Sequence, residues 1–254
     1  MKISKVDMKI SNVGAVVPIY NEESTLGNVL LQLYYCKNID RIVVVDDGST
    51  DQTWHNLKLF KMIDKHNKLK LIRLKKNSGK GNAVKVGVKF LDKYLDASFN
   101  YILLFDADLI GLEEWHIQRM IDDVKNPGIS MVIGLRDKGN IFLNMLMPYF
   151  PLNGGERAFE RGVLIDIIKS PLIEGWGLES VMNDYCRKKK LGVSKIMLNG
   201  LDHIGIQTKK YGIKAFAKEV FDVINTKRRL IGMRWNKWFM NSLNGGIILY
   251  VDYF

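Results

Sequence analysis

Continuous apolar segments alternate with amphipathic segments through the first 135 residues, and this alternation constrains the fold more than any other feature. The apolar segments are short and rich in Val, Ile and Leu. Such runs are typical of strands buried on both faces of a parallel sheet, which requires helices above and below it. We therefore predict an α/β fold, with strands at 13–19, 41–46, 69–74, 101–105 and 130–135. Helices are predicted at 26–35, from an N-cap at Ser49, Thr50 or Asp51 to about 64, after 81, and at 112–124.

The pattern is looser after residue 135. We predict a strand or loop at 153–159, helices at 161–168 and 177–190, a strand at 193–198 and a basic helix at 211–230. The segment 142–150 is apolar, but no apolar run approaches the ~20 residues that span a bilayer, and the nearest, 247–251, is far too short. The first residues lack the apolar run of a signal peptide, and the two cysteines are far apart in sequence. These features predict a cytoplasmic protein.

Polar residues follow four of the predicted strands at the point where each strand ends. In parallel sheets, ligands bind beyond the carboxyl ends of the strands. We therefore expect these residues to form one ligand site along a single edge of the sheet. They are Tyr20 and Glu22 after the first strand, Asp46 and Asp47 after the second, Asn77 to Gly81 after the third, and Asp106 and Asp108 after the fourth.

Carboxylates at these strand ends suggest a metal and a nucleotide. Asp106 and Asp108 offer the oxygen ligands that Mg²⁺ and Mn²⁺ prefer, although a polar turn without a ligand would have the same pattern. Asp46 and Asp47 can accept hydrogen bonds from a nucleobase and a ribose, or belong to a turn before a capped helix. The stretch from Asn77 to Gly81 has the spacing of neither phosphate-binding glycine motif, but its Lys80 supplies a cation.

Four motifs occur in the order seen in a known family. They are Val17-Pro-Ile-Tyr-Asn-Glu22, Val44-Val-Asp-Asp-Gly-Ser-Thr-Asp51, Asn77-Ser-Gly-Lys-Gly-Asn-Ala83 and Asp106-Ala-Asp108. Together they resemble the nucleotide-sugar half of a family 2 glycosyltransferase with the GT-A fold. The resemblance implies a donor-binding half at 13–110 and an acceptor half at 111–205 of a domain spanning 1–205, with an appendage at 206–254. It also implies that the donor contacts Pro18, Tyr20, Glu22, Asp46, Asp47, Asn77, Lys80, Gly81 and Asp106, while Asp106 and Asp108 bind Mg²⁺ or Mn²⁺ and Asp108 takes part in catalysis.

The acceptor side has weaker matches. Asn153-Gly-Gly-Glu-Arg-Ala-Phe159 resembles a segment of the polyprenyl-phosphate sugar synthases of this family, which usually carry Phe before the Arg. This implies that Arg157 contacts an acceptor phosphate, with surface solvation as the alternative; Arg161 fits the surface role better. Glu179 resembles an acidic residue that acts as general base or orients the acceptor, and the alternative is a charge that complements the helix dipole. Trp176 would contact the sugar, and His203 would be a third metal ligand or a structural histidine.

The formal net charge of +11 calls for an anionic partner, and the excess is concentrated near the C-terminus. Residues 209–237 contain nine basic and two acidic side chains, and Trp235 and Trp238 lie beside the last of the basic residues. This segment fits a peripheral helix on the inner face of an anionic membrane, or a solvated helix packed on the sheet. No recognised nucleic-acid motif accompanies the charge, so we expect no nucleic-acid partner.

These observations predict a metal-dependent glycosyltransferase that uses a UDP-, GDP- or TDP-sugar, with a lipid-linked polyprenyl phosphate as its acceptor. One alternative is a soluble glycosyltransferase with a small phosphorylated or hydroxyl acceptor. Another is a non-catalytic basic adaptor for membranes or nucleic acid on the same fold. A sugar nucleotidyltransferase is disfavoured because Val13 to Asn21 contains one glycine and no glycine-rich triphosphate loop.

Overall fold

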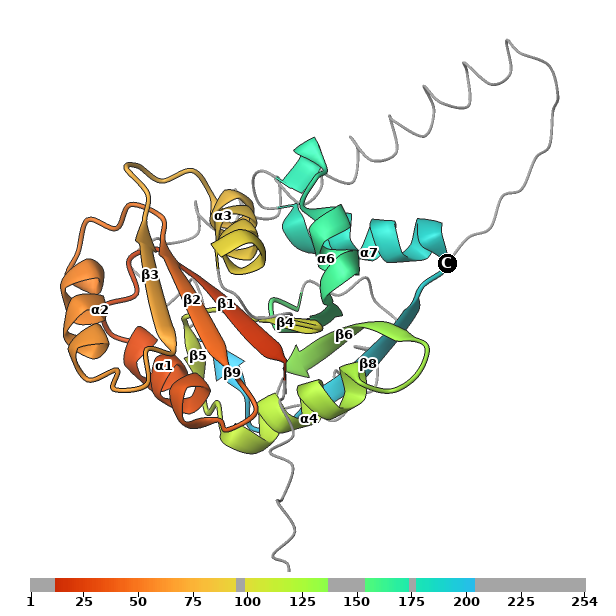
Figure 1. The fold of residues 1–254 in the computed structure, drawn as a ribbon, viewed down its shortest axis with the longest axis horizontal. Coiled ribbons are helices and arrows are strands. Elements are labelled where there is room, and N and C mark those ends of the chain that lie inside the picture. The colour runs from red at the N-terminus through yellow and green to blue at the C-terminus, as the bar shows by residue number, and fades with distance from the viewer. Residues whose placement is uncertain (1–11, 95–98, 137–153, 174–176, 204–254) are drawn as a thin grey trace, which may run out of the picture.

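A seven-stranded sheet forms the centre of the computed structural model, which describes residues 12–94, 99–136, 154–173 and 177–203 (Figure 1). The strand order is β3-β2-β1-β4-β7-β6-β8. A separate pair is formed by β5 and β9. The strands are β1 Val13–Ile19, β2 Arg41–Asp46, β3 Leu69–Arg73, β4 Tyr101–Leu104, β5 Leu109–Ile110, β6 Ile129–Arg136, β7 Arg157–Glu160, β8 Gly192–Leu198 and β9 Asp202–His203.

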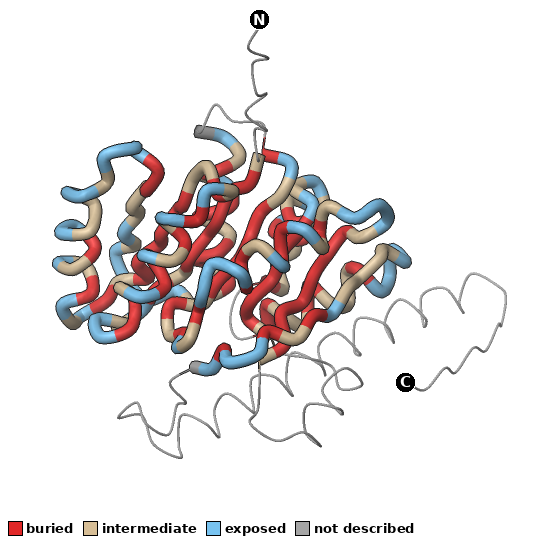
Figure 2. The backbone as a smooth tube through the Cα atoms, turned by 90° about the horizontal axis from the view of Figure 1, so that it is seen from below, coloured by how far each residue is buried: buried red, intermediate tan, exposed pale blue. Residues whose placement is uncertain are grey.

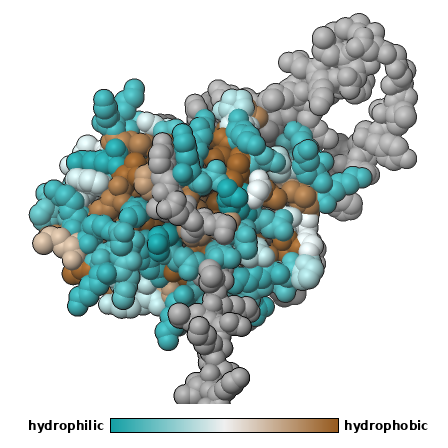
Figure 3. Space-filling view, viewed as in Figure 1, coloured by the Kyte–Doolittle hydropathy of each residue, from teal (hydrophilic) through white to brown (hydrophobic). Residues whose placement is uncertain are grey.

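Helices cover both faces of this sheet, as the continuous apolar strands predict. One buried cluster joins the sheet to α1 (Leu26–Tyr35), α2 (Thr53–Met62) and α4 (Glu114–Val124). A second cluster on the other face joins it to α3 (Lys80–Tyr94), α6 (Arg161–Ile167) and α7 (Leu178–Lys189), with a 3₁₀ turn at Pro171–Ile173. Burial is concentrated in the strands, while exposed residues lie in the loops and on outer helix surfaces (Figure 2). Hydrophilic residues predominate on the face drawn in Figure 3.

One strand runs against the others. β7 is antiparallel to both of its neighbours, β4 and β6, whereas β1, β2, β3, β4, β6 and β8 all run the same way. The predicted strand or loop at 153–159 is therefore a strand that begins at Arg157, beside the carboxyl ends of β4 and β6. We call the edge that holds the carboxyl ends of the parallel strands and the start of β7 the rim.

Of the three N-caps predicted for α2, Ser49 and Thr50 were wrong, while the side chain of Asp51 binds the first helical N–H. The helix begins at Thr53, and neither Ser49 nor Thr50 caps it. Both residues instead bond to Asn21 in the loop after β1, where the Asn21 N–H donates to Ser49 Oγ and the Thr50 N–H donates to Asn21 Oδ1, each at 2.9 Å. Tertiary contacts between two loops have taken the place of a local cap, and Asp51 accepts the Thr53 N–H.

The C-terminal end of α1 is held by a buried lysine. Lys68 Nζ donates to the carbonyl oxygens of Leu33, Tyr34 and Cys36 at 3.1, 2.6 and 2.7 Å. These are the carbonyls that a helix end leaves without intrahelical partners, and a cation there also complements the helix dipole.

We expect Lys68→Met to lower the free energy of unfolding by about 2 kcal/mol, because buried carbonyls would lose a charged donor. Lys70→Met, two residues along in β3, is the matched control, since Lys70 Nζ bonds an exposed side chain, Asn67 Oδ1. The control should change stability by less than about 0.5 kcal/mol. Urea unfolding followed by circular dichroism measures both, and equal effects would contradict the capping role.

Within the residues that the structure describes, no helix is both long and apolar enough to cross a bilayer. Cys36 and Cys186 are buried free thiols. The predicted basic helix at 211–230, the appendage at 206–254 and the apolar segment 142–150 lie outside the described residues.

Candidate active site

Two loops of the rim are tied together by side chains from the first two motifs. Besides the Asn21 bonds to Ser49 and Thr50, the Glu22 N–H donates to Thr53 Oγ1 at 2.8 Å. Glu22 itself accepts a hydrogen bond from Thr25 Oγ1 at 2.7 Å. Ser49, Thr50 and Thr53 therefore fix the loop after Tyr20, which is 37% exposed at the end of β1.

Asp46 ends β2 and is fully buried. One carboxylate oxygen accepts the Ser49 N–H at 2.9 Å, and the other lies 3.1 Å from Arg73 Nε. The Arg73 guanidinium lies over the ring of Trp54, 5.3 Å from its centroid. These partners neutralise the buried carboxylate in the free protein, so a predicted contact with a nucleobase would add to them or replace them.

Asp47 holds the loop that leads into α3. Its two oxygens accept the N–H groups of Ser78 and Gly79 at 2.8 and 2.7 Å. Burial raises the pKa of Asp47, although these two hydrogen bonds oppose the rise. Gly48 must be glycine for this contact, because it has a φ of +74° and a Cβ there would lie 2.7 Å from the Lys76 carbonyl carbon. Asp47 thereby fixes the start of α3, where Lys80 stands.

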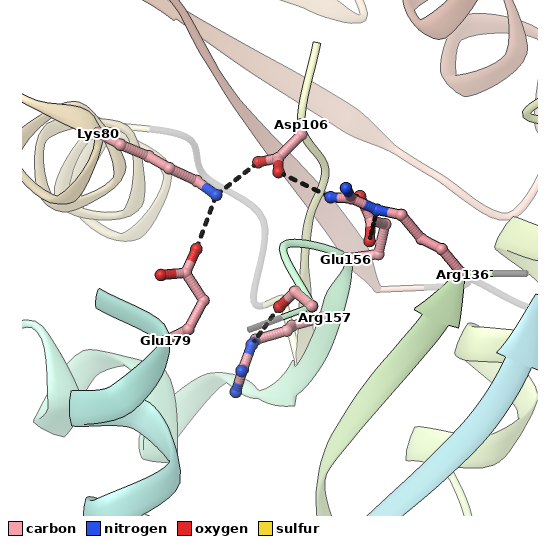
Figure 4. A network of polar contacts seen from close by, with 7 residues as sticks. Lys80, Asp106, Arg136, Glu156, Arg157 and Glu179 are labelled. Carbon is pink, nitrogen blue, oxygen red and sulfur yellow. Dashed lines mark hydrogen bonds and ion pairs between the residues drawn. The ribbon is translucent and has the colours of Figure 1, made fainter. Parts of the chain in front are cut away.

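Lys80 joins two carboxylates from opposite sides of the rim (Figure 4). Its Nζ lies 2.7 Å from Asp106 Oδ1, just after β4, and 2.8 Å from Glu179 Oε1, in the first turn of α7. Burial disfavours the ammonium form, but the charges of Asp106 and Glu179 outweigh this and raise the pKa of Lys80. The structure therefore brings together three residues that the sequence predicts for the site.

The other oxygen of Asp106 faces Arg136, the last residue of β6, at 3.2 Å. Arg136 also donates two hydrogen bonds to Glu156, from Nε and from Nη2, each 2.9 Å long. Burial disfavours the charged guanidinium, but Glu156 and Asp106 together raise the pKa of Arg136. Sequence reasoning missed Arg136 and gave Glu156 no role, although Arg136 is a strand-end residue like the others.

Gly155 and Arg157, at the start of β7, are both closely packed by the residues around them. A Cβ on Gly155 would lie 2.0 Å from Asp106 Oδ2, so only glycine fits beside that carboxylate. Arg157 is fully buried and donates to Gly154 O at 2.9 Å and to Asn183 Oδ1 at 2.7 Å. The alternative of surface solvation for Arg157 was wrong, and the predicted phosphate contact would require the guanidinium to leave these partners.

The acidic pair fits a divalent cation by its donor chemistry. Asp108 is half-buried, and its negative charge contributes, after those of Glu156 and Asp106, to the raised pKa of Arg136. The backbone of His203 pairs with Leu109 across β5 and β9, next to Asp108. Among the side chains that the structure describes, no three His, Cys, Asp or Glu residues are grouped as metal ligands. The His203 side chain is not among them, so its role as third ligand stays a prediction.

The remaining predicted residues are distributed unevenly. Asn77 is exposed at the rim, while Gly81 is buried in the first turn of α3 and Pro18 lies within β1 beside Val45. Arg161 pairs with Asp92 at the opposite edge of the sheet, and its side chain is 40% exposed, which agrees with a surface role. A cavity of about 660 Å³ at that edge is therefore separate from the rim. Trp176 lies outside the described residues.

The sheet order and the acidic rim define a GT-A fold. The structure is similar to glucosyl-3-phosphoglycerate synthase from Mycobacterium tuberculosis in complex with Mn²⁺, uridine diphosphate and phosphoglyceric acid, with a TM-score of 0.64 and 20% sequence identity. The match covers 84% of this chain and 76% of that chain. A complex of the same enzyme with Mn²⁺, UDP-glucose and glycerol 3-phosphate gives a TM-score of 0.63. At this identity the likeness establishes the fold.

The chain belongs to glycosyl transferase family 2, whose family model matches residues 15–152. It is 30% identical over 139 residues to the poly-beta-1,6-N-acetyl-D-glucosamine synthase of Staphylococcus epidermidis, and 31% identical over 141 residues to that of Staphylococcus aureus (strain COL). Each match covers 52% of this chain and 31% of the relative. The chain therefore matches about a third of the length of these relatives, and the predicted family and fold are confirmed.

Proposed function

We propose that this protein transfers a sugar from a nucleoside diphosphate sugar, with Mg²⁺ or Mn²⁺ held by Asp106 and Asp108. The observation that carries this proposal is the position of Asp106 between Lys80 and Arg136, opposite Glu179. A site with carboxylates for a cation and cations for a diphosphate matches the charges of such a donor. The bound Mn²⁺ and uridine diphosphate of the structural neighbour support the same assignment.

The residues of the rim would divide the work by charge. A divalent cation held by Asp106 and Asp108 would act as a Lewis acid and stabilise negative charge on the leaving diphosphate. Lys80 adds a fixed ammonium that can pair with a phosphate oxygen when the diphosphate takes the place of Asp106 or Glu179. Glu179 is then free to accept the proton of a hydroxyl acceptor, or to orient an acceptor that is already ionised.

For the acceptor we propose a lipid-linked phosphate, supported by the resemblance of 153–159 and by the basic residues of 209–237. A soluble phosphorylated acceptor is the second candidate, because the structural neighbour holds phosphoglyceric acid and because Arg157 is buried among internal partners. Peripheral membrane contact belongs to the first candidate alone. Flotation with anionic vesicles, with and without polyprenyl phosphate, separates the two.

The donor is tested by thermal unfolding of the full chain with UDP-, GDP- and TDP-sugars in the presence of Mn²⁺. Because a ligand that binds the folded state raises the melting temperature, we expect one base to give a shift of several degrees. The same donor should release its nucleoside diphosphate when the acceptor is added, and EDTA should remove both effects. A flat response to every donor would contradict the proposed function.

A further inference from the structure

Glu156 is a fully buried carboxylate that is linked to Asp106 through Arg136. Glu156 lies just before β7. Its backbone oxygen accepts the Gly134 N–H at 2.9 Å, and this bond holds Glu156 beside the end of β6, two residues before Arg136. Both of its carboxylate oxygens accept hydrogen bonds from Arg136. Two parallel N–H···O bonds of this kind fix the guanidinium in orientation as well as in position.

Arg136 transmits this constraint to Asp106. Its Nη2 is shared between Glu156 Oε1 at 2.9 Å and Asp106 Oδ2 at 3.2 Å (Figure 4). The guanidinium is only 13% exposed, so solvent screens its charge weakly. The negative charge of Glu156 therefore offsets much of the positive charge that Arg136 brings next to Asp106.

We propose that Glu156 is a positioning residue that sets the charge felt by the Asp106–Asp108 pair, and so sets the preference of the site for a divalent cation. This inference rests on the proposed function. Without the Glu156 carboxylate, the charge of Arg136 acts on the pair uncompensated. It then repels a divalent cation and attracts the diphosphate, so the two affinities change in opposite directions.

The test measures two probes separately on the folded full chain. Mn²⁺ alone is titrated by electron paramagnetic resonance, and inorganic pyrophosphate is titrated by calorimetry in EDTA. For Glu156→Gln we expect Mn²⁺ to bind at least about tenfold more weakly and pyrophosphate several-fold more tightly than in the wild type. A purely structural role would weaken both, and an unchanged Mn²⁺ affinity would overturn the inference.

The double variant R136Q/E156Q is the matched control, because it removes both charges, with a Gln that has the shape of Glu156 and a Gln that retains the Cβ–Cγ–Cδ stem of Arg136. We expect it to bind Mn²⁺ within about threefold of the wild type, since the pair is lost as a unit. This comparison also stands if E156Q alone does not fold. A loss of more than about tenfold in the double variant would refute charge compensation. If the wild type binds neither probe, the proposed function fails together with this inference, whereas wild-type binding with an unaltered E156Q removes the inference alone.

Discussion

Asp106→Asn is expected to lower kcat/KM for sugar transfer about a thousandfold, a loss of about 4 kcal/mol in transition-state stabilisation. The change keeps the size of the side chain and removes the charge that Lys80 and Arg136 share from two sides. Initial rates at varied donor concentration, with excess Mn²⁺, measure the effect. The variant should still fold, because both cations retain a second carboxylate partner, in Glu179 and Glu156.

Asp166→Asn is the control for this change. Asp166 is an exposed residue of α6 that pairs with Lys169, far from the rim. Its loss should leave kcat/KM within about twofold, as for most surface substitutions. If Asp106→Asn kept more than a tenth of the wild-type rate, the acidic pair would not be the centre of the reaction.

Lys80→Met should cost about a hundredfold to a thousandfold in kcat, because the ammonium between Asp106 and Glu179 is the cation best placed to meet a diphosphate. In the titrations with Mn²⁺ and with pyrophosphate, Lys80→Met and Asp106→Asn should change the two affinities in opposite ways. Pyrophosphate binding in EDTA should be lost with Lys80→Met, while Mn²⁺ binding should be kept or tightened because Asp106 loses a competing cation. In Asp106→Asn, Mn²⁺ binding should be lost and pyrophosphate binding kept.

Lys89→Met serves as the matched control, since Lys89 is an exposed residue on the same helix. It should leave both affinities and the rate within about twofold. Loss of Mn²⁺ and pyrophosphate binding together in Lys80→Met would indicate a distorted site, and would contradict the assigned role of the ammonium.

Much of the fold follows from local sequence. The buried runs that became β1, β2 and β4 are rich in Val, Ile and Leu without polar residues at alternate positions, which favours a sheet covered on both faces. The same strand-end reasoning placed Asp106 and Lys80 at one edge, where the structure joins them at 2.7 Å. Predictions of this kind succeed because topology alone brings the carboxyl ends of parallel strands together.

Long-range pairing was harder to predict. Ser49 and Thr50 have the chemistry of N-caps, but a loop 28 or more residues earlier in the chain competes for them. Glu156 has no local signal at all, because its partner Arg136 is 20 residues away and is reached only through the reversed β7. The hydrogen bonds that Asp47 accepts from Ser78 and Gly79 were likewise not predictable, because they form only when the end of β2 lies beside the start of α3.

The reversed direction of β7 places both ends of its connection to β6 at the rim. Because β6 ends at Arg136 and β7 begins at Arg157, the connection between these two strands leaves and re-enters the sheet on one and the same side, beside Asp106. Between residues 137 and 153 the length of this connection can change without shifting the pairing of any strand, whereas Gly155 and Glu156 are fixed by their contacts with Asp106 and Arg136. Under the proposed function, a change in this connection would alter the side chains offered beside Asp106 and leave Asp46, Asp47 and Lys80 in place on their own elements.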